Sequence, residues 1–167
     1  SDAKDLFYDQ DNDTFWVCDS GNNRILRLDT DLKVTGCYTG FTGSTEISVG
    51  EDGRSTFLNP NGIYVKKSIF DDKLYVYIAD TDNSRAVKCT VESGTEMTLV
   101  QEYTKPDTKL YDSETFNPSK ILADKAENIY VVCKSVNTGS VQFNKDGEFQ
   151  GFYGANRVEV TAAVIAQ

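Results

Sequence analysis

Histidine is absent from the 167-residue chain, and methionine, tryptophan and proline are scarce, with one, one and three copies. The missing imidazole removes the commonest general base, the Ser-His-Asp and Cys-His nucleophile systems, and the usual ligand of catalytic zinc. The composition therefore disfavours most hydrolase and lyase chemistry.

Positive charge is also scarce, because 17 Lys and Arg stand against 26 Asp and Glu, for a net charge of −9. Proteins that bind nucleic acid gain most of their affinity from clustered Lys and Arg, and the sequence has no such cluster. No apolar run approaches the ~20 residues needed to cross a bilayer. We therefore expect neither nucleic acid nor direct membrane contact as a partner of this segment.

The four cysteines, Cys18, Cys37, Cys89 and Cys133, form no Cys-x-x-Cys pair. The usual sequence signs of zinc or redox chemistry are therefore missing. Each cysteine lies in an apolar stretch of β type, which predicts buried free thiols. A disulfide, between Cys18 and Cys133 or another pair, is the alternative.

Three segments of the chain align as copies of one unit of strands and turns. In the first two copies an Asp, an Asn and an Arg follow the second strand at the same offsets. These residues are Asp19, Asn22, Arg24, Asp80, Asn83 and Arg85. The third copy keeps Asn137 but aligns Lys134 and Gly139 with the Asp and the Arg. Asn tolerates a left-handed turn, and Arg can bridge back to the Asp, so we interpret the repeated set as structural.

The repeats predict an all-β chain of about three four-stranded antiparallel blades, which together make a β-propeller region. The expected blades are residues 5–39, 61–104 and 119–154 of a single region 1–167, and residues 155–167 form a tail of helix or strand. Three blades leave open sheet edges, which tend to pair with another chain. We therefore expect a partial ring that is completed by a homo-oligomer or by further blades.

The Asp-x-x-Asn-x-Arg motif between apolar strands, with Asn-Pro at residues 59–60 and 117–118, resembles the NHL repeat over about residues 5–153. Residues 57–90 and 116–154 are similar to NHL-type regions found ahead of membrane-embedded Yip1-like domains in Gram-positive gut bacteria. The resemblance implies a six-bladed type of propeller within a larger bacterial protein. It also implies an extracytoplasmic or cell-surface location.

We expect a non-enzymatic module that binds a protein or a small ligand, because long loops on a rigid scaffold are where binding usually resides. The candidate residues lie in the long connections 39–58 and 105–117 and at the starts of strands. They are Phe41, Glu46, Arg54, Asn59, Asn61, Tyr111, Asn117 and Lys120. The alternative for both connections is a plain spacer between blades.

Two further functions remain open. The NHL-like lyases depend on histidine-rich sites, but lactonase-type propellers hold a divalent metal through Glu, Asn and Asp. The oxygen ligands available for calcium or magnesium are Glu46, Asn59, Asn61, Asn117 and Asp124. We expect no cofactor, with calcium as the alternative. The acidic run at residues 9–13 does not match a calcium loop, since Thr14 stands where that loop needs Gly. The last possibility is a purely structural segment of a larger propeller.

Overall fold

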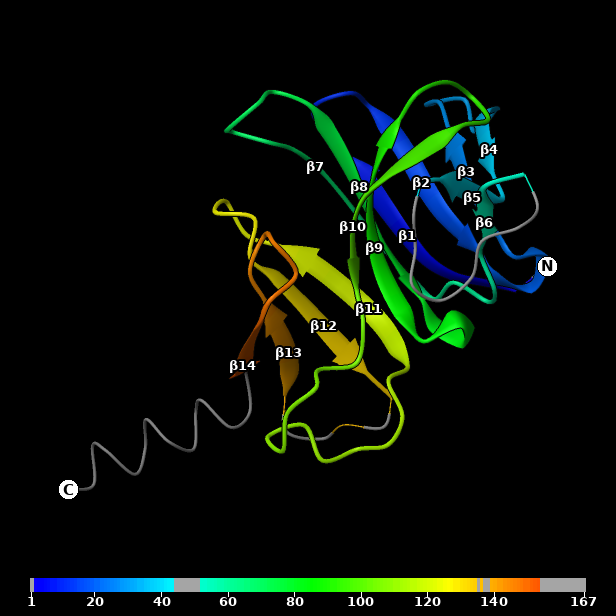
Figure 1. The fold of residues 1–167 in the computed structure, drawn as a ribbon. Helices are drawn as coiled ribbons and strands as arrows, with labels where there is room; N and C mark the ends of the chain where they lie inside the picture. The colour runs from blue at the N-terminus through cyan, green and yellow to red at the C-terminus, as the bar shows by residue number, and fades with distance from the viewer. Residues whose placement is uncertain (1, 44–51, 135, 137–138, 154–167) are drawn as a thin grey trace.

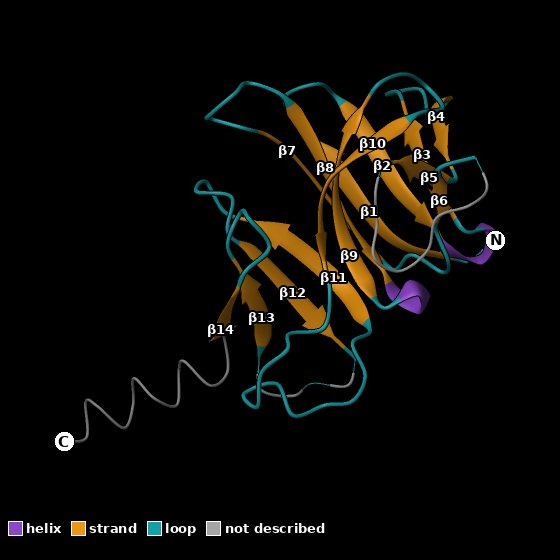
Figure 2. Cartoon of the chain, viewed as in Figure 1, coloured by secondary structure: helices purple, strands orange, loops and turns teal. Residues whose placement is uncertain are grey.

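The computed structural model describes residues 2–43, 52–134, 136 and 139–153, which form three antiparallel sheets (Figures 1 and 2). The first sheet holds β1 (Ala3–Asp9), β2 (Thr14–Asp19), β3 (Arg24–Leu28) and β4 (Val34–Tyr38). The second holds β7 (Gly62–Lys67), β8 (Leu74–Asp80), β9 (Arg85–Val91) and β10 (Met97–Tyr103). The third holds β11 (Pro118–Ala123), β12 (Ile129–Cys133), β13 (Ser140–Phe143) and β14 (Phe149–Tyr153).

In each sheet these four strands form an antiparallel meander, in which neighbouring strands are joined by turns and pair in chain order. Left-handed residues such as Asp13, Asp72 and Glu127 close the turns between the first two strands of each sheet. The second sheet lies between the other two and contributes to two apolar cores. Its strands are therefore buried on both faces, which explains the nearly continuous apolar run of β8.

The first strands of the three sheets lie together, because β7 contacts both β1 and β11. Figure 1 shows the sheets fanned out in chain order, from blue through green to orange. Successive meanders that pack face to face around their first strands have the architecture of propeller blades. The expected all-β propeller fold is confirmed.

The connection 39–58 departs from the expectation of a spacer or loop. It supplies two short strands, β5 (Gly40–Thr42) and β6 (Arg54–Thr56), which extend the second sheet to six strands. Thr42 of β5 pairs in parallel with Thr98 of β10. Gly40 permits the pairing of β5 with β6, because a Cβ there would lie 1.9 Å from a carbonyl oxygen of β6.

The register of the third sheet corrects one detail of the repeat. Cys133 pairs with Pro118, just as Asp19 pairs with Ala3 in the first sheet. Cys133, and not Lys134, therefore occupies the Asp position. The error arose because the third copy has a longer connection between its second and third strands, with six residues where the first two copies have four.

All four cysteines are free, and Cys37 is the only one of them that is not buried. The described helices are two 3-10 turns, η1 (Ser20–Asn22) and η2 (Thr81–Asn83). Within the described ranges, no helix has the length and apolarity to cross a membrane. The tail 155–167 and the predicted site residues Glu46 and Asn137 lie outside the described residues.

Candidate functional site

The repeated Asp-x-x-Asn-x-Arg residues bond to one another in the first sheet. Arg24 donates from Nε to Asp19 Oδ2 over 2.7 Å, and Asn22 donates to the same carboxylate over 3.1 Å. Burial alone would raise the pKa of Asp19, but these two donors hold it below its ordinary value. The chain leaves the turn through Asn23 at φ 55°, a conformation that Asn tolerates.

The equivalent residues of the second sheet form the same bonds in a much drier place. Arg85 donates from Nε to Asp80 Oδ2 over 2.8 Å, and both side chains are fully buried. Leu58 donates its backbone N–H to Asp80 Oδ1 over 2.9 Å. The Arg85 guanidinium also lies 4.8 Å from the ring centre of Phe41, a predicted ligand residue that is fully buried. Phe41 is thus part of the core, packed beside Phe57.

The residue after each motif Asp ties one sheet to the next. Ser20 Oγ donates to the Pro60 carbonyl, and Thr81 Oγ1 donates to the Pro118 carbonyl over 2.6 Å. Sequence analysis missed this contact. Its signal was available, because a hydroxyl residue follows the Asp in both of the first two copies and Pro begins the next sheet.

Where the first strands meet, Asp5 joins all three sheets. Its Oδ2 accepts from the Ile63 N–H over 2.9 Å, and its Oδ1 lies 3.3 Å from Lys120 Nζ. Gly62 lies between them, and a Cβ there would be 2.9 Å from Lys120 Cα. Lys120, a predicted ligand residue, is engaged in this bridge. The neighbouring Asn61 is 5% exposed, and its Oδ1 has no hydrogen-bond partner among the described residues.

The oxygen donors considered for a metal are not gathered at one point. Asn59 donates from Nδ2 to Asp82 over 3.0 Å. Among the described residues, no hydrogen bond joins it to Asn117 or Asp124. Asn117 and Asp124 flank opposite ends of the six-residue strand β11, about 23 Å apart at ~3.3 Å per residue. Asp124 instead holds its own turn, accepting from the N–H groups of residues 126 and 128. No cluster of three carboxylate or thiol ligands occurs in the part of the chain that the structure describes.

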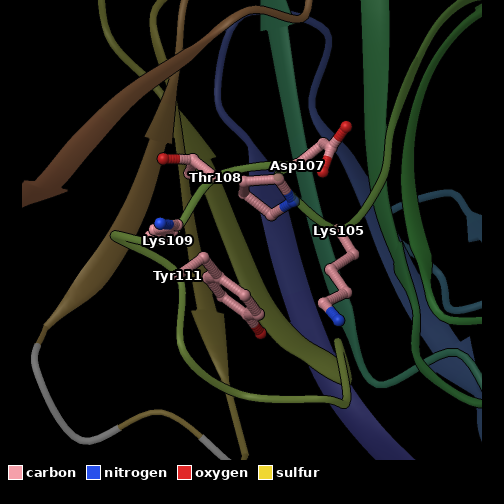
Figure 3. A pocket seen from close by; sticks show the side chains of 6 residues that line it. Lys105, Asp107, Thr108, Lys109 and Tyr111 are labelled. Carbon is pink, nitrogen blue, oxygen red and sulfur yellow. The ribbon is translucent and has the colours of Figure 1, made fainter.

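A cavity of about 490 Å³ lies against the connection between β10 and β11. Its lining residues are Lys105, Pro106, Asp107, Thr108, Lys109 and Tyr111. Figure 3 shows Lys105 and Tyr111 extending to one side of the connection, and Asp107 to the other. This cavity is the candidate functional site.

Tyr111, one of the lining residues, is buried and held in place by hydrogen bonds and ring contacts. The backbone N–H of Tyr111 donates to the Thr108 carbonyl over 3.2 Å, and the Tyr111 hydroxyl donates to the Thr115 carbonyl over 2.6 Å. The Tyr111 ring stacks on Phe152 with a centroid distance of 6.4 Å and packs edge-on against Phe116. The connection is therefore fastened to the third sheet by an aromatic cluster.

Arg54, another predicted ligand residue, lies away from this cavity. Its guanidinium pairs with Glu96 across the outer edge of the second sheet. Of the predicted ligand residues that the structure describes, only Tyr111 lines the cavity. The two lysines around it were noted in the sequence only as part of a long connection.

No protein-family model and no curated protein matches the chain. Among solved structures, a streptogramin B lyase is similar over 89% of this chain and 53% of that chain, with 14% identity and a TM-score of 0.44. A gluconolactonase from Xanthomonas campestris is similar over 90% of this chain and 61% of that chain, with 16% identity and a TM-score of 0.43. Both are β-propeller proteins. The chain thus spans between half and two thirds of the length of either structure.

Proposed function

We propose that this chain is a non-enzymatic, NHL-type binding module whose ligand is held at the cavity beside residues 105–111. The observation that carries the proposal is the cavity itself, which lies on a long connection fixed by Tyr111 to a rigid sheet. Rigid scaffolds with functional loops are the usual arrangement in binding proteins. We further propose that residues 1–167 are one propeller region of a larger bacterial protein.

The chemistry of the cavity rim favours a ligand that combines an acidic and an apolar group. Neither Lys105 nor Lys109 forms an ion pair with any residue that the structure describes. Leu110, which lies between Lys109 and the buried Tyr111 in the sequence, is 71% exposed. Two lysine side chains at the cavity and an exposed apolar side chain next to Lys109 in the sequence suit an acidic, leucine-like peptide segment.

The state of the carboxylates elsewhere supports binding over catalysis. Asp19 and Asp80 are bonded to the arginines of their own turns, and Asp5 is bonded to two neighbouring strands. Asp124 is occupied in its turn, where hydrogen bonds from Asn128 outweigh burial and lower its pKa. General acid or base catalysis needs a carboxyl group free to exchange protons with a substrate, with a pKa tuned towards neutral pH.

The test is a titration followed by backbone amide NMR, with acetyl-Leu-Glu as the probe and acetyl-Leu-Gln-amide as the uncharged match. We expect acetyl-Leu-Glu to shift the amide signals of residues 105–111, and the shifts to disappear in Lys105→Glu/Lys109→Glu. Lys125→Glu, in an exposed turn outside the cavity, is the control and should behave as wild type.

The proposal fails if acetyl-Leu-Glu shifts no signals in residues 105–111, or if the control abolishes the shifts as fully as the double variant does. The lactonase-type alternative makes the opposite prediction. It requires lactone hydrolysis that depends on added calcium or magnesium and is unaffected by the two lysine changes.

A further inference from the structure

Each internal contact between sheets joins two kinds of face. We call the face that a sheet turns to its predecessor the leading face, and the face that it turns to its successor the trailing face. In the second sheet the leading face carries Ile63, Val65, Ile78 and Val87, all buried in the core shared with the first sheet. The trailing face of the first sheet supplies the stacked pair Trp16 and Tyr38 on the other side of that core.

The first sheet has a leading face of the same apolar kind. Leu6 pairs with Val17 and Val17 with Leu26, the same pairing that joins Ile63, Ile78 and Val87 in the second sheet. Leu6 is 62% exposed, and Tyr8, the equivalent of Val65, is 46% exposed. A patch that is buried in the second sheet is therefore open in the first.

The third sheet presents the matching trailing face. Tyr130 and Tyr153 stand where the first sheet has Trp16 and Tyr38, and their rings also pack together, 5.2 Å apart. Beside them, Leu122 and Val132 are 48% and 45% exposed.

Ser20 and Thr81 each bond to the start of the next sheet. The corresponding start of the first sheet borders a cavity of about 570 Å³. Its lining includes Leu6 and Val17, so the cavity is continuous with the open leading face.

We propose that two copies of this chain associate head to tail, with the trailing face of each third sheet covering the leading face of the other copy's first sheet. The chain itself carries both halves of an interface that occurs twice within it. This argues for a second copy as the occupant. The contact is heterologous, and a two-fold axis closes it into a ring that covers both pairs of faces at once. This assembly is independent of the cavity beside residues 105–111.

The test measures mass by light scattering and sedimentation. Wild type should have twice the 18.6 kDa chain mass at micromolar concentration. Leu6→Asp on the leading face and Val132→Asp on the trailing face should each give a monomer. A one-to-one mixture of the two variants should return to twice the chain mass. The intact trailing face of Leu6→Asp can meet the intact leading face of Val132→Asp, and both substitutions then fall in the other contact of the ring. Ile69→Asp, at a residue that is 68% exposed in a turn, is the matched control and should stay dimeric.

Circular dichroism spectra that match wild type will show that each variant is folded. A monomeric wild type overturns the proposal and leaves the two faces to further blades. A mixture that stays monomeric also overturns it, because only a head-to-tail contact predicts the rescue.

Discussion

The sharpest test of the repeat motif is the substitution Asp80→Asn, which removes one charge from a fully buried ion pair and keeps the side-chain shape. Asp80 is held by Arg85, by Asn83 over 2.9 Å and by the Leu58 backbone N–H. The amide can still accept from Leu58. It leaves Arg85 without its carboxylate partner at 2.8 Å.

Removing one partner of a buried pair costs about 3–5 kcal/mol, because the remaining charge stays buried. Arg85 keeps weaker partners, with Glu102 at 3.4 Å and the Thr56 carbonyl at 3.2 Å. We therefore expect the lower end, about 3 kcal/mol. Asp19→Asn is the matched control, because the same motif there has an Arg24 side chain that is 39% exposed. Solvent screens that pair, so its loss should cost about 1 kcal/mol or less.

Urea denaturation of both variants at neutral pH measures the difference, with an unchanged slope as the sign that the two-state comparison holds. A cost for Asp80→Asn equal to that of Asp19→Asn would refute the reasoning. If Asp80→Asn does not fold, the double variant Asp80→Asn/Arg85→Met provides the test. It should recover folding, because it removes the buried charge that the single change leaves behind.

Three further outcomes follow from the described packing. Gly62→Ala should destabilise the chain by about 1–3 kcal/mol in urea, because the new methyl would lie 2.6 Å from a carbonyl oxygen of β11. Burial and the hydrogen bond to Asp71 raise the pKa of Tyr75 from 10.0 to about 12. Protonated Tyr75 therefore contributes its full stability to the folded state below pH 10, and this contribution is lost as the pH rises towards 12. A tyrosinate absorbance titration of Tyr75→Phe should lose one of the late-titrating tyrosines, and Asp71→Asn should move the ionisation of Tyr75 to lower pH. In a thiol-reagent assay Cys37 alone should react in the native state, and all four thiols after unfolding, whereas a disulfide would leave two unreactive.

The sequence was sufficient to predict the three meanders, because a period-two apolar pattern and the recurring Asp, Asn and Arg each record a local requirement of a strand or a turn. The strands β5 and β6 escaped prediction because they are short and join the sheet only through the pairing of β5 with β10, more than 50 residues along the chain. Local pattern carries no information about such a pairing. Phe41 looked like a surface aromatic for the same reason.

The candidate site was predictable only as a region. The length of the connection 105–117 indicated a functional loop, but the cavity depends on where Tyr111 packs against Phe116 and Phe152. Those contacts join a loop to a distant strand, and no spacing in the sequence records them. The predicted ligand residue Asn59 bonds instead to Asp82 in a turn of the second sheet, and Lys120 belongs to a contact between sheets.

The bridge between Asp5 and Lys120 also has a consequence for the order of folding. Each meander can form from neighbouring hairpins, which close within about 1–10 μs. The Asp5 carboxylate gains its ion-pair partner only when Lys120, far along the chain, comes close. Closing so large a loop is entropically slow. During synthesis, the first sheet would therefore leave the ribosome before its strand β1 can form the bridge from Asp5 to Lys120. The junction of the three first strands should be the last part of the described molecule to gain protection from hydrogen exchange.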